Sequence, residues 1–413
     1  MRSTALIVSF ILTALCAVPS SAGELERRQA KRIFDRITGT PPSAAVLDQM
    51  EDALLTDSSG MSAAEIALAD PAFYNVTLKN WATPWTNEAQ SVFDPLNDYS
   101  ATVIGMVRDD VDFRQLLYGD ILYTGANSLN ISSYAHSNNN HYIQLEQLGP
   151  VAADLSDDSI LIKTTQSAQP GGLPAAATGG VITTRAAAKS FFYLGTNRAM
   201  FRFTLMNHLC TDLEPIKDNT RAPDRVRQDV SRSPGGDSRI YINSCVGCHA
   251  GMDALAGAYA YYDLEFAGDK DTEVDSFENS ARLGYSAGNV SAKHLINANN
   301  FITGHITVDD SWVNYWRVGQ NALLGWNDYP GVVKNEQGHA YGSGVKSMGM
   351  ELANSDAFAQ CQVKKAFKAI CLRDPDGFTA DRSEVQSIVN RFTASGYRMK
   401  QVFRDVAAYC KGN

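Results

Sequence analysis

Residues 245–249 read Cys245-Val246-Gly247-Cys248-His249. This stretch indicates that the chain folds around a bound cofactor. Two thiols lie three positions apart, and a histidine directly follows the second. On the first turn of a helix, both thiols reach one edge of a flat macrocycle while the imidazole turns towards the metal at its centre. This spacing is typical of covalent c-type haem attachment. We therefore predict one haem c, bound covalently through Cys245 and Cys248.

Three other roles are open to the two thiols. A disulfide between residues so close in sequence is strained, and a thioredoxin-like redox motif needs a βαβ context. A zinc site needs a second ligand pair of similar spacing. The sequence offers neither that context nor that pair, so haem attachment is the favoured interpretation.

His249 is the predicted proximal ligand of the haem iron, with its other ring nitrogen held by an acceptor. The sequence leaves the distal ligand open. Met348 is the first candidate, because it lies in the segment Gly-Ser-Gly-Val-Lys-Ser-Met-Gly-Met (342–350), whose small residues let the backbone approach a flat cofactor. His305 is the second candidate. A distal Met or His favours an electron carrier, whereas a vacant position allows peroxide or oxygen chemistry.

Composition and charge narrow the class of protein. The 413 residues include 36 Lys and Arg against 45 Asp and Glu, a formal net charge of −9, and 44% are hydrophobic. This is an ordinary globular composition, neither disordered nor fibrous. Because no long run of Lys or Arg occurs, we predict no nucleic-acid partner. The predicted haem implies a redox partner protein instead.

Residues 1–22 have the pattern of a signal peptide. A basic start at Arg2 precedes an apolar run over 5–18, and Ser20 and Ala22 are small residues at the positions that a signal peptidase reads. Pro19 ends the run after about 14 residues, whereas a membrane span needs about 20. We predict cleavage near Ala22, no membrane span in the mature chain and a periplasmic location. Covalent haem attachment also occurs outside the bacterial inner membrane, so the two predictions support each other.

Four cysteines remain once the motif and Cys16 of the leader are set aside, namely Cys210, Cys361, Cys371 and Cys410. In an oxidising compartment an even set suggests two disulfides, with three connectivities open. If the C-terminal region is three antiparallel helices, its first and third run parallel, which brings Cys371 and Cys410 to the same end. We therefore predict Cys371–Cys410 and Cys210–Cys361.

Helical periodicity is clearest in the C-terminal third. Apolar residues recur at helical spacing in three sets: Val363, Ala366, Phe367, Ile370; Val385, Ile388, Val389, Phe392; and Val402, Phe403, Val406. Upstream, we predict helices over 24–38 and 41–55, a third opened by a capping box at Ser62 and Glu65, and a long buried helix over 189–210.

The predicted fold is mainly α and multi-helical, with a cytochrome c-like haem-binding region and a three-helix C-terminal module. Four segments follow: a signal peptide (1–22), an N-terminal helical region (23–150), the haem-binding region (151–340) and the C-terminal module (341–413).

These residues carry a resemblance to a family. The block over 245–253, followed by Tyr262-Asp263, resembles the CxxCHxxMD block of exported bacterial monohaem cytochrome c-like proteins. The chain departs from that pattern at Ala254, where the group more often has Pro. Further positions are similar to the helical portions of the group: Arg32-Ile33-Phe34-Asp35-Arg36, Gly39-Thr40-Pro41-Pro42, Asp112-Phe113-Arg114, Phe358, Cys361, Asp381 and Gly396-Tyr397.

The resemblance implies a haem-binding redox protein and leaves the reaction open. We predict an exported monohaem c-type cytochrome that transfers electrons between a periplasmic redox enzyme and a respiratory acceptor. The alternative is a haem enzyme, a peroxidase or oxygenase, with an open distal site on the same haem. The size of the scaffold favours the enzyme, because a simple soluble carrier needs only about 100 residues for its single core.

Overall fold

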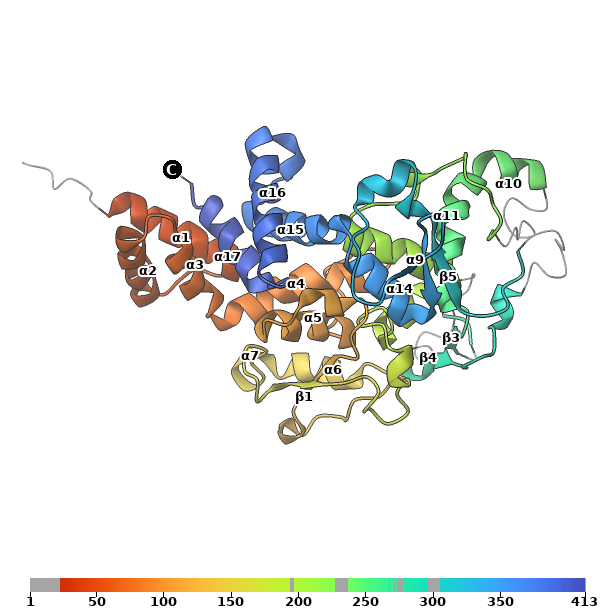
Figure 1. The fold of residues 1–413 in the computed structure, drawn as a ribbon. Coiled ribbons are helices and arrows are strands. Elements are labelled where there is room, and N and C mark those ends of the chain that lie inside the picture. The colour runs from red at the N-terminus through yellow and green to blue at the C-terminus, as the bar shows by residue number, and fades with distance from the viewer. Residues whose placement is uncertain are drawn as a thin grey trace, which may run out of the picture.

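A computed structural model describes residues 23–193, 197–226, 237–266, 268–270, 272, 278–295 and 305–412, and its described part is mainly helical (Figure 1). The fold class predicted from the sequence is confirmed at this level. The predicted signal peptide, residues 1–22, lies outside the described residues. None of the described helices is long and apolar enough to cross a bilayer.

Three helices open the described chain: α1 (Glu24–Thr38), α2 (Ala44–Thr56) and α3 (Met61–Leu68). The first two match the predicted segments, and α1 ends where Gly39 takes a left-handed φ of 73°. The predicted capping box is wrong. Gly60 precedes the first residue of α3, and the Ser62 hydroxyl, already inside the helix, donates to Asp57 at 3.0 Å.

The middle of the chain contains shorter helices: α4 (Lys79–Ala82), α5 (Asp98–Arg108), α6 (Asn140–Gln147), α7 (Gly149–Ala152), α8 (Arg185–Phe191) and α9 (Arg198–Thr204). Every residue of α5 is buried, so this helix forms the centre of the molecule. The long helix predicted over 189–210 is broken, because α8 ends at Phe191 and α9 begins after Asn197, which has a φ of 58°. The break redirects the chain and leaves Arg198 at the start of a new helix.

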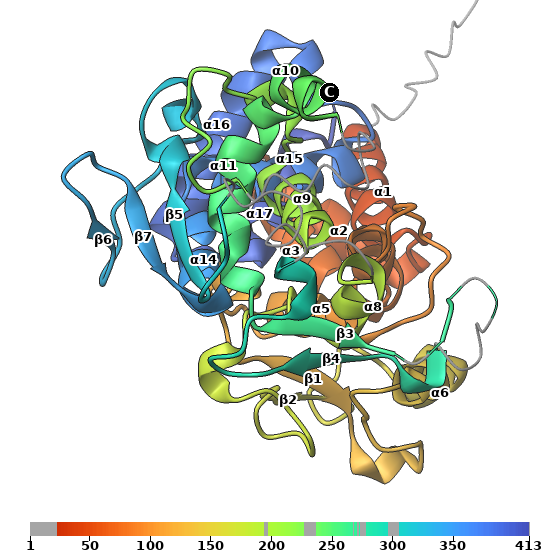
Figure 2. The same ribbon diagram turned by 90° about the vertical axis from the view of Figure 1, so that its right-hand side faces the viewer.

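In the described part of the chain, seven short strands form three small antiparallel sheets. They are β1 (Leu122–Gly125) with β2 (Leu161–Thr164), β3 (Tyr262–Glu265) with β4 (Arg282–Tyr285), and β7 (Ala340–Ser343) between β5 (Ser311–Asn314) and β6 (Val333–Lys334). Leu122 lies opposite Thr164, Tyr262 opposite Tyr285 and Ser311 opposite Ser343. Figure 2 shows the third sheet along one side of the molecule, beside the helix that carries the cysteine motif.

Two helices lie around the cysteine motif, α10 (Ser238–Ser244) and α11 (Val246–Ala256). The chain then closes with α14 (Gly344–Ala353), α15 (Asp356–Cys371), α16 (Thr379–Ala394) and α17 (Met399–Tyr409). The last three are the three helices predicted from periodicity. Both predicted disulfides are confirmed, with Cα–Cα separations of 5.2 Å for Cys210–Cys361 and 5.5 Å for Cys371–Cys410.

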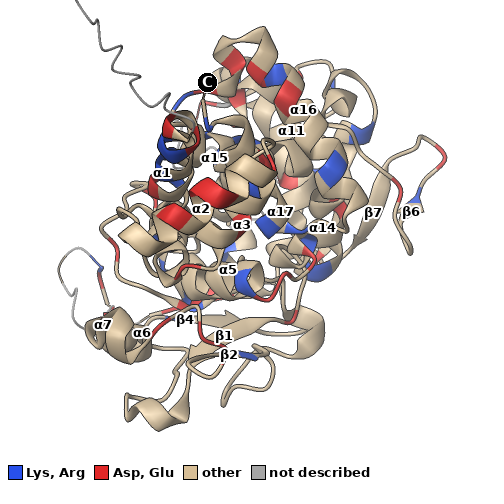
Figure 3. Ribbon diagram, turned by 90° about the vertical axis from the view of Figure 1, so that its left-hand side faces the viewer, with Lys and Arg blue, Asp and Glu red and all other residues tan. Residues whose placement is uncertain are grey.

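One contiguous hydrophobic core draws on all three predicted mature segments, from Ile33 through Val103 and Trp316 to Phe403. The C-terminal helix α17 packs on α3 and α1, so segments far apart in sequence lie side by side. In Figure 3, α1 and α16 carry both acidic and basic positions, whereas α2 carries acidic positions only. In Figure 1, α1 and α11 lie at opposite ends of the molecule.

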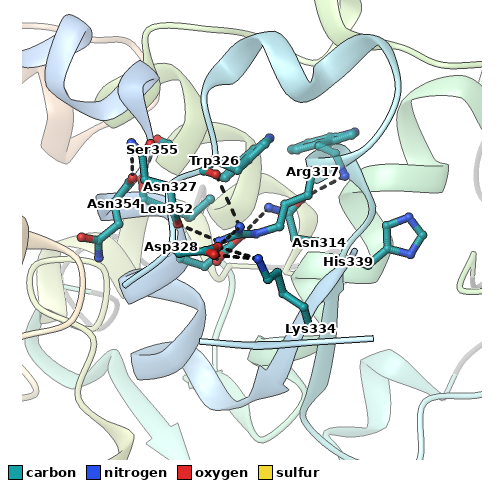
Figure 4. A network of polar contacts seen from close by, with 12 residues as sticks. Asn314, Arg317, Trp326, Asn327, Asp328, Lys334, His339, Leu352, Asn354 and Ser355 are labelled. Atoms are coloured by element: carbon teal, nitrogen blue, oxygen red, sulfur yellow. Dashed lines mark hydrogen bonds and ion pairs between the residues drawn. The ribbon is translucent and has the colours of Figure 1, made fainter. Parts of the chain in front are cut away.

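A buried ion pair joins the short 3-10 helix that follows β5 (Tyr315–Arg317) to α14, and Figure 4 shows Arg317 among its polar neighbours Asn314 and Asp328. The guanidinium of Arg317 meets Glu351 through Nε at 2.7 Å and Nη2 at 2.9 Å, and these side chains are 5% and 0% exposed. Arg317 also contacts Asp328 at 2.9 Å and donates to the carbonyl of Asn327 at 2.8 Å. Asn314 donates to the same carboxylate of Glu351 at 2.6 Å, so Arg317 and Asn314 both donate to this buried carboxylate.

Candidate haem-attachment site

The cysteine motif lies at the start of α11, as predicted. Cys245 precedes the first helical residue, and its carbonyl accepts the backbone N–H groups of Cys248 and His249 at 3.2 Å each. The Cys245 N–H donates in turn to the Tyr241 carbonyl of α10 at 2.9 Å. The two thiols and the imidazole therefore project from one turn of backbone that is hydrogen-bonded on both sides.

Cys245 and Cys248 are both half-buried, and neither takes part in a disulfide. The other four cysteines of the described chain are paired with each other. Burial and the Glu214 carboxylate raise the pKa of the Cys248 thiol. A raised pKa is the opposite of what a reactive thiolate in a disulfide-exchange motif needs, so the redox-motif interpretation loses support.

Two glycines let α11 pack closely on its surroundings. A Cβ at Gly247 would lie 2.1 Å from Oδ1 of Asn219, and a Cβ at Gly251 would lie 2.0 Å from Nε1 of Trp316. Since two residues turn an α-helix by about 200°, Trp316 packs on the face of α11 opposite to His249. Trp316 therefore supports the helix from behind and does not face the imidazole.

His249 is held by a buried carboxylate one turn further along α11. Its Nδ1 lies 3.2 Å from Oδ1 of Asp253, whose side chain is 0% exposed. An ionised carboxylate only accepts hydrogen bonds, so Nδ1 is the donor in this contact and Nε2 is the ring nitrogen left for a metal. The ring of Tyr241 lies beside the imidazole, with centroids 5.5 Å apart.

Arg198 holds Asp253 in turn from the first turn of α9. The guanidinium is bidentate, with Nε 2.7 Å from Oδ1 and Nη2 2.5 Å from Oδ2. Burial alone would raise the pKa of Asp253, but Arg198 and His249 outweigh burial and hold that pKa well below its usual range. Asp253 is therefore a carboxylate at neutral pH. Arg198 orients it, and it accepts the hydrogen bond of His249.

The two distal candidates lie in different surroundings. Met348 is 0% exposed inside the main hydrophobic core, on α14. The motif is bordered by a separate small cluster of Val226, Tyr241 and Ala250, with Cys245 and Val246 packed against it. The main core also includes Met252 and Leu255 of α11, so α14 and α11 contribute to one core.

His305 is linked to the small cluster beside the motif. Its backbone N–H donates to the Val226 carbonyl at 3.1 Å, which ties it to that small cluster. His305, Arg225 and Asp253 also line one cavity of about 210 Å³. The carboxylate that holds His249 thus shares a cavity with one of the two predicted distal ligands.

Arg198 and Tyr241 are the site residues that sequence reasoning missed. Arg198 lies 55 positions before Asp253, and the helix predicted over 189–210 hid the start of α9 at which it lies. Asp253 itself was visible as part of the block over 245–253, but its role depends on a partner that no local pattern reveals.

The donor set fits a covalently attached haem: two unpaired thiols on a helix start, and an imidazole whose Nδ1 is occupied. Within the described ranges, no group of three or more His, Cys, Asp or Glu side chains is arranged to hold a metal ion unaided. Neither a scan against protein-family models nor searches of curated proteins and of solved structures returns a match to this chain. Its function is therefore inferred from the geometry of its own residues.

Proposed function

We propose that this chain is an exported monohaem c-type cytochrome, related to the cytochrome c-like group described above. In this proposal it transfers electrons between a periplasmic redox enzyme and a respiratory acceptor. One observation carries the proposal: among the described residues, the two cysteines in no disulfide are the two at the start of α11, next to a histidine whose Nδ1 is occupied. The two disulfides are compatible with export to an oxidising compartment.

The chain supplies the attachment, the axial ligand and the orientation. Cys245 and Cys248 would form the two thioether bonds, and His249 would bind the iron through Nε2. Haem c, when bound, supplies a one-electron Fe(III)/Fe(II) couple. Asp253 fixes the tautomer and the ring plane of His249, and Arg198 fixes Asp253. Arg225, which lines the adjacent cavity, is the candidate partner of a haem propionate.

The alternative function, a haem peroxidase or oxygenase, depends on what lies opposite His249. Met348 stays the first candidate for the distal position and His305 the second, and either ligand favours the electron carrier. An open distal position favours the enzyme.

Visible spectroscopy of the full chain, coexpressed with a c-type maturation system, tests the proposal. We expect a covalent haem spectrum that survives acidic solvent extraction. A low-spin spectrum unchanged by carbon monoxide would identify the electron carrier. A high-spin spectrum that shifts with carbon monoxide would identify the enzyme, and absence of covalent haem would overturn both.

The exchange Asp253→Asn is expected to raise the reduction potential of the haem. A neutral amide accepts the Nδ1–H hydrogen bond more weakly than a carboxylate does, so the imidazole becomes a less basic ligand. Fe(III) is then less stabilised relative to Fe(II). We expect at least a tenfold shift of the oxidised-to-reduced equilibrium, about 59 mV for one electron. Redox titration followed in the visible range measures it.

Asp381→Asn is the matched control for this experiment. Asp381 also receives a bidentate arginine, Arg373, at 2.7 and 2.9 Å, and its side chain is only 4% exposed. It lies on α16 and does not contact the motif. An equal change of potential in both variants would contradict a specific effect through His249.

A further inference from the structure

A second cavity, of about 610 Å³, opens between α1, the segment around α4 and α15. Its wall includes Trp81, Trp85 and Lys365, and Leu372 lies at its edge with 67% of its surface exposed. Its volume lies within the range typical of small-molecule sites, roughly 300–1,000 Å³. In Figure 1, α1 lies at the opposite end of the molecule from α11, so the cavity is separate from the cysteine motif.

Lys365 lines this cavity without a carboxylate partner. Its Nζ donates to the Asn207 carbonyl at 2.6 Å and lies 2.9 Å from the centroid of the Trp85 ring. Burial holds the pKa of Lys365 well below its usual range, and no carboxylate of the described residues counters this effect. Its neighbours on α15 differ, because Lys364 pairs with Asp376 and Lys368 with Asp374.

The other polar groups around the cavity are mostly hydrogen-bond donors. The indole Nε1 of Trp81 is buried and has no hydrogen-bond partner among the described residues. Arg36 and Lys368 also line the wall. The one lining carboxylate, Asp35, pairs with Lys31 through Oδ2 at 2.5 Å, and its buried Oδ1 has no hydrogen-bond partner among the described residues. The donors outnumber this acceptor, so the set matches a negatively charged ligand that accepts hydrogen bonds.

The indole rings define the rest of the ligand. Trp81 and Trp85 lie edge to face with centroids 4.5 Å apart, and both rings line the cavity. Tryptophan offers a large apolar surface that favours contact with flat rings. Burial disfavours the charged form of Lys365, and an anionic group next to its Nζ would favour that form and pair with it.

We propose that this cavity binds a small organic carboxylate with a flat aromatic body. The carboxylate pairs with Lys365 and accepts from the neighbouring donors, and the ring packs against Trp81 and Trp85. This site does not depend on the haem proposal, since none of its residues belongs to the motif.

Calorimetric titration of the full chain with 2-naphthoate and with its neutral analogue 2-naphthamide tests this site. We expect saturable binding of 2-naphthoate and at least tenfold weaker binding of the amide. Equal affinities, or no saturable binding of the acid at millimolar concentration, would overturn the proposal, whatever the haem content of the sample.

Lys365→Met and its neighbour Lys364→Met locate the binding. We expect the first exchange to weaken 2-naphthoate binding at least tenfold and the second to leave it unchanged. Because Lys365 has no carboxylate partner to leave behind, its removal is not expected to unfold the chain. Unchanged affinity in Lys365→Met would show that the anion binds elsewhere. If that variant fails to fold, Trp85→Leu with the same pair of probes decides the question.

Discussion

Replacing Cys245 and Cys248 together by alanine is expected to abolish covalent haem attachment while leaving the fold intact. Both thiols are half-buried on the first turn of α11 and belong to no disulfide, so their loss removes the thioether positions and no structural cross-link. Acidic solvent extraction should then remove every trace of haem absorbance from the protein. Far-ultraviolet circular dichroism should keep the helical signal of the parent chain.

The double exchange Cys371→Ser with Cys410→Ser is the matched control, because it also removes two sulfurs. These two form a disulfide, with Cα atoms 5.5 Å apart. This variant should keep covalent haem and lose about 2–4 kcal/mol in the free energy of unfolding. Covalent haem retained without Cys245 and Cys248 would show that the motif is not the attachment site.

The exchange Glu351→Ala is expected to lower the free energy of unfolding by about 3–5 kcal/mol. Glu351 is completely buried and receives two nitrogens of Arg317, which is 5% exposed. Removing the carboxylate leaves the buried guanidinium of Arg317 with Asp328 and the carbonyl of Asn327 as its close partners. Urea denaturation followed by circular dichroism measures the loss.

Two further variants separate the charge from the packing. Asp328→Ala removes the other carboxylate beside Arg317, but Asp328 is 61% exposed, and we expect a loss below about 1 kcal/mol. Replacing the pair together, Arg317→Met with Glu351→Leu, should recover most of the stability, because no uncompensated charge remains. A double variant as unstable as Glu351→Ala would contradict this explanation.

Local patterns predicted those parts of the fold that local physics controls. The helices α1, α15, α16 and α17 each place apolar residues on one face at helical spacing, and that face is buried in the core. The pairing of Cys371 with Cys410 followed from the direction of those helices. The motif at 245–249 likewise lies on the first helical turn, where its spacing predicts it.

The features that were missed depend on contacts between distant segments. The break between α8 and α9 is an example, since the apolar periodicity runs through it and only the left-handed backbone at Asn197 reveals it. Arg198 then reaches Asp253 across 55 positions, and no local pattern encodes that distance. The capping box failed for a related reason, because the side chain of Asp57 engages Ser62 from outside the helix.

The packing of α17 on α1 and α3 has a consequence for how the chain acquires its structure. The side chain of Gln29 donates to the carbonyl of Gly412, 383 positions later, so this corner closes only after nearly all of the described chain has been synthesised. Until then, Ile33, Phe34 and Ala64 lack part of the core that covers them in the folded state. Contacts of such long sequence separation slow folding, and exposed apolar faces invite aggregation. We therefore expect the newly made chain to be most prone to aggregation before α17 has been synthesised.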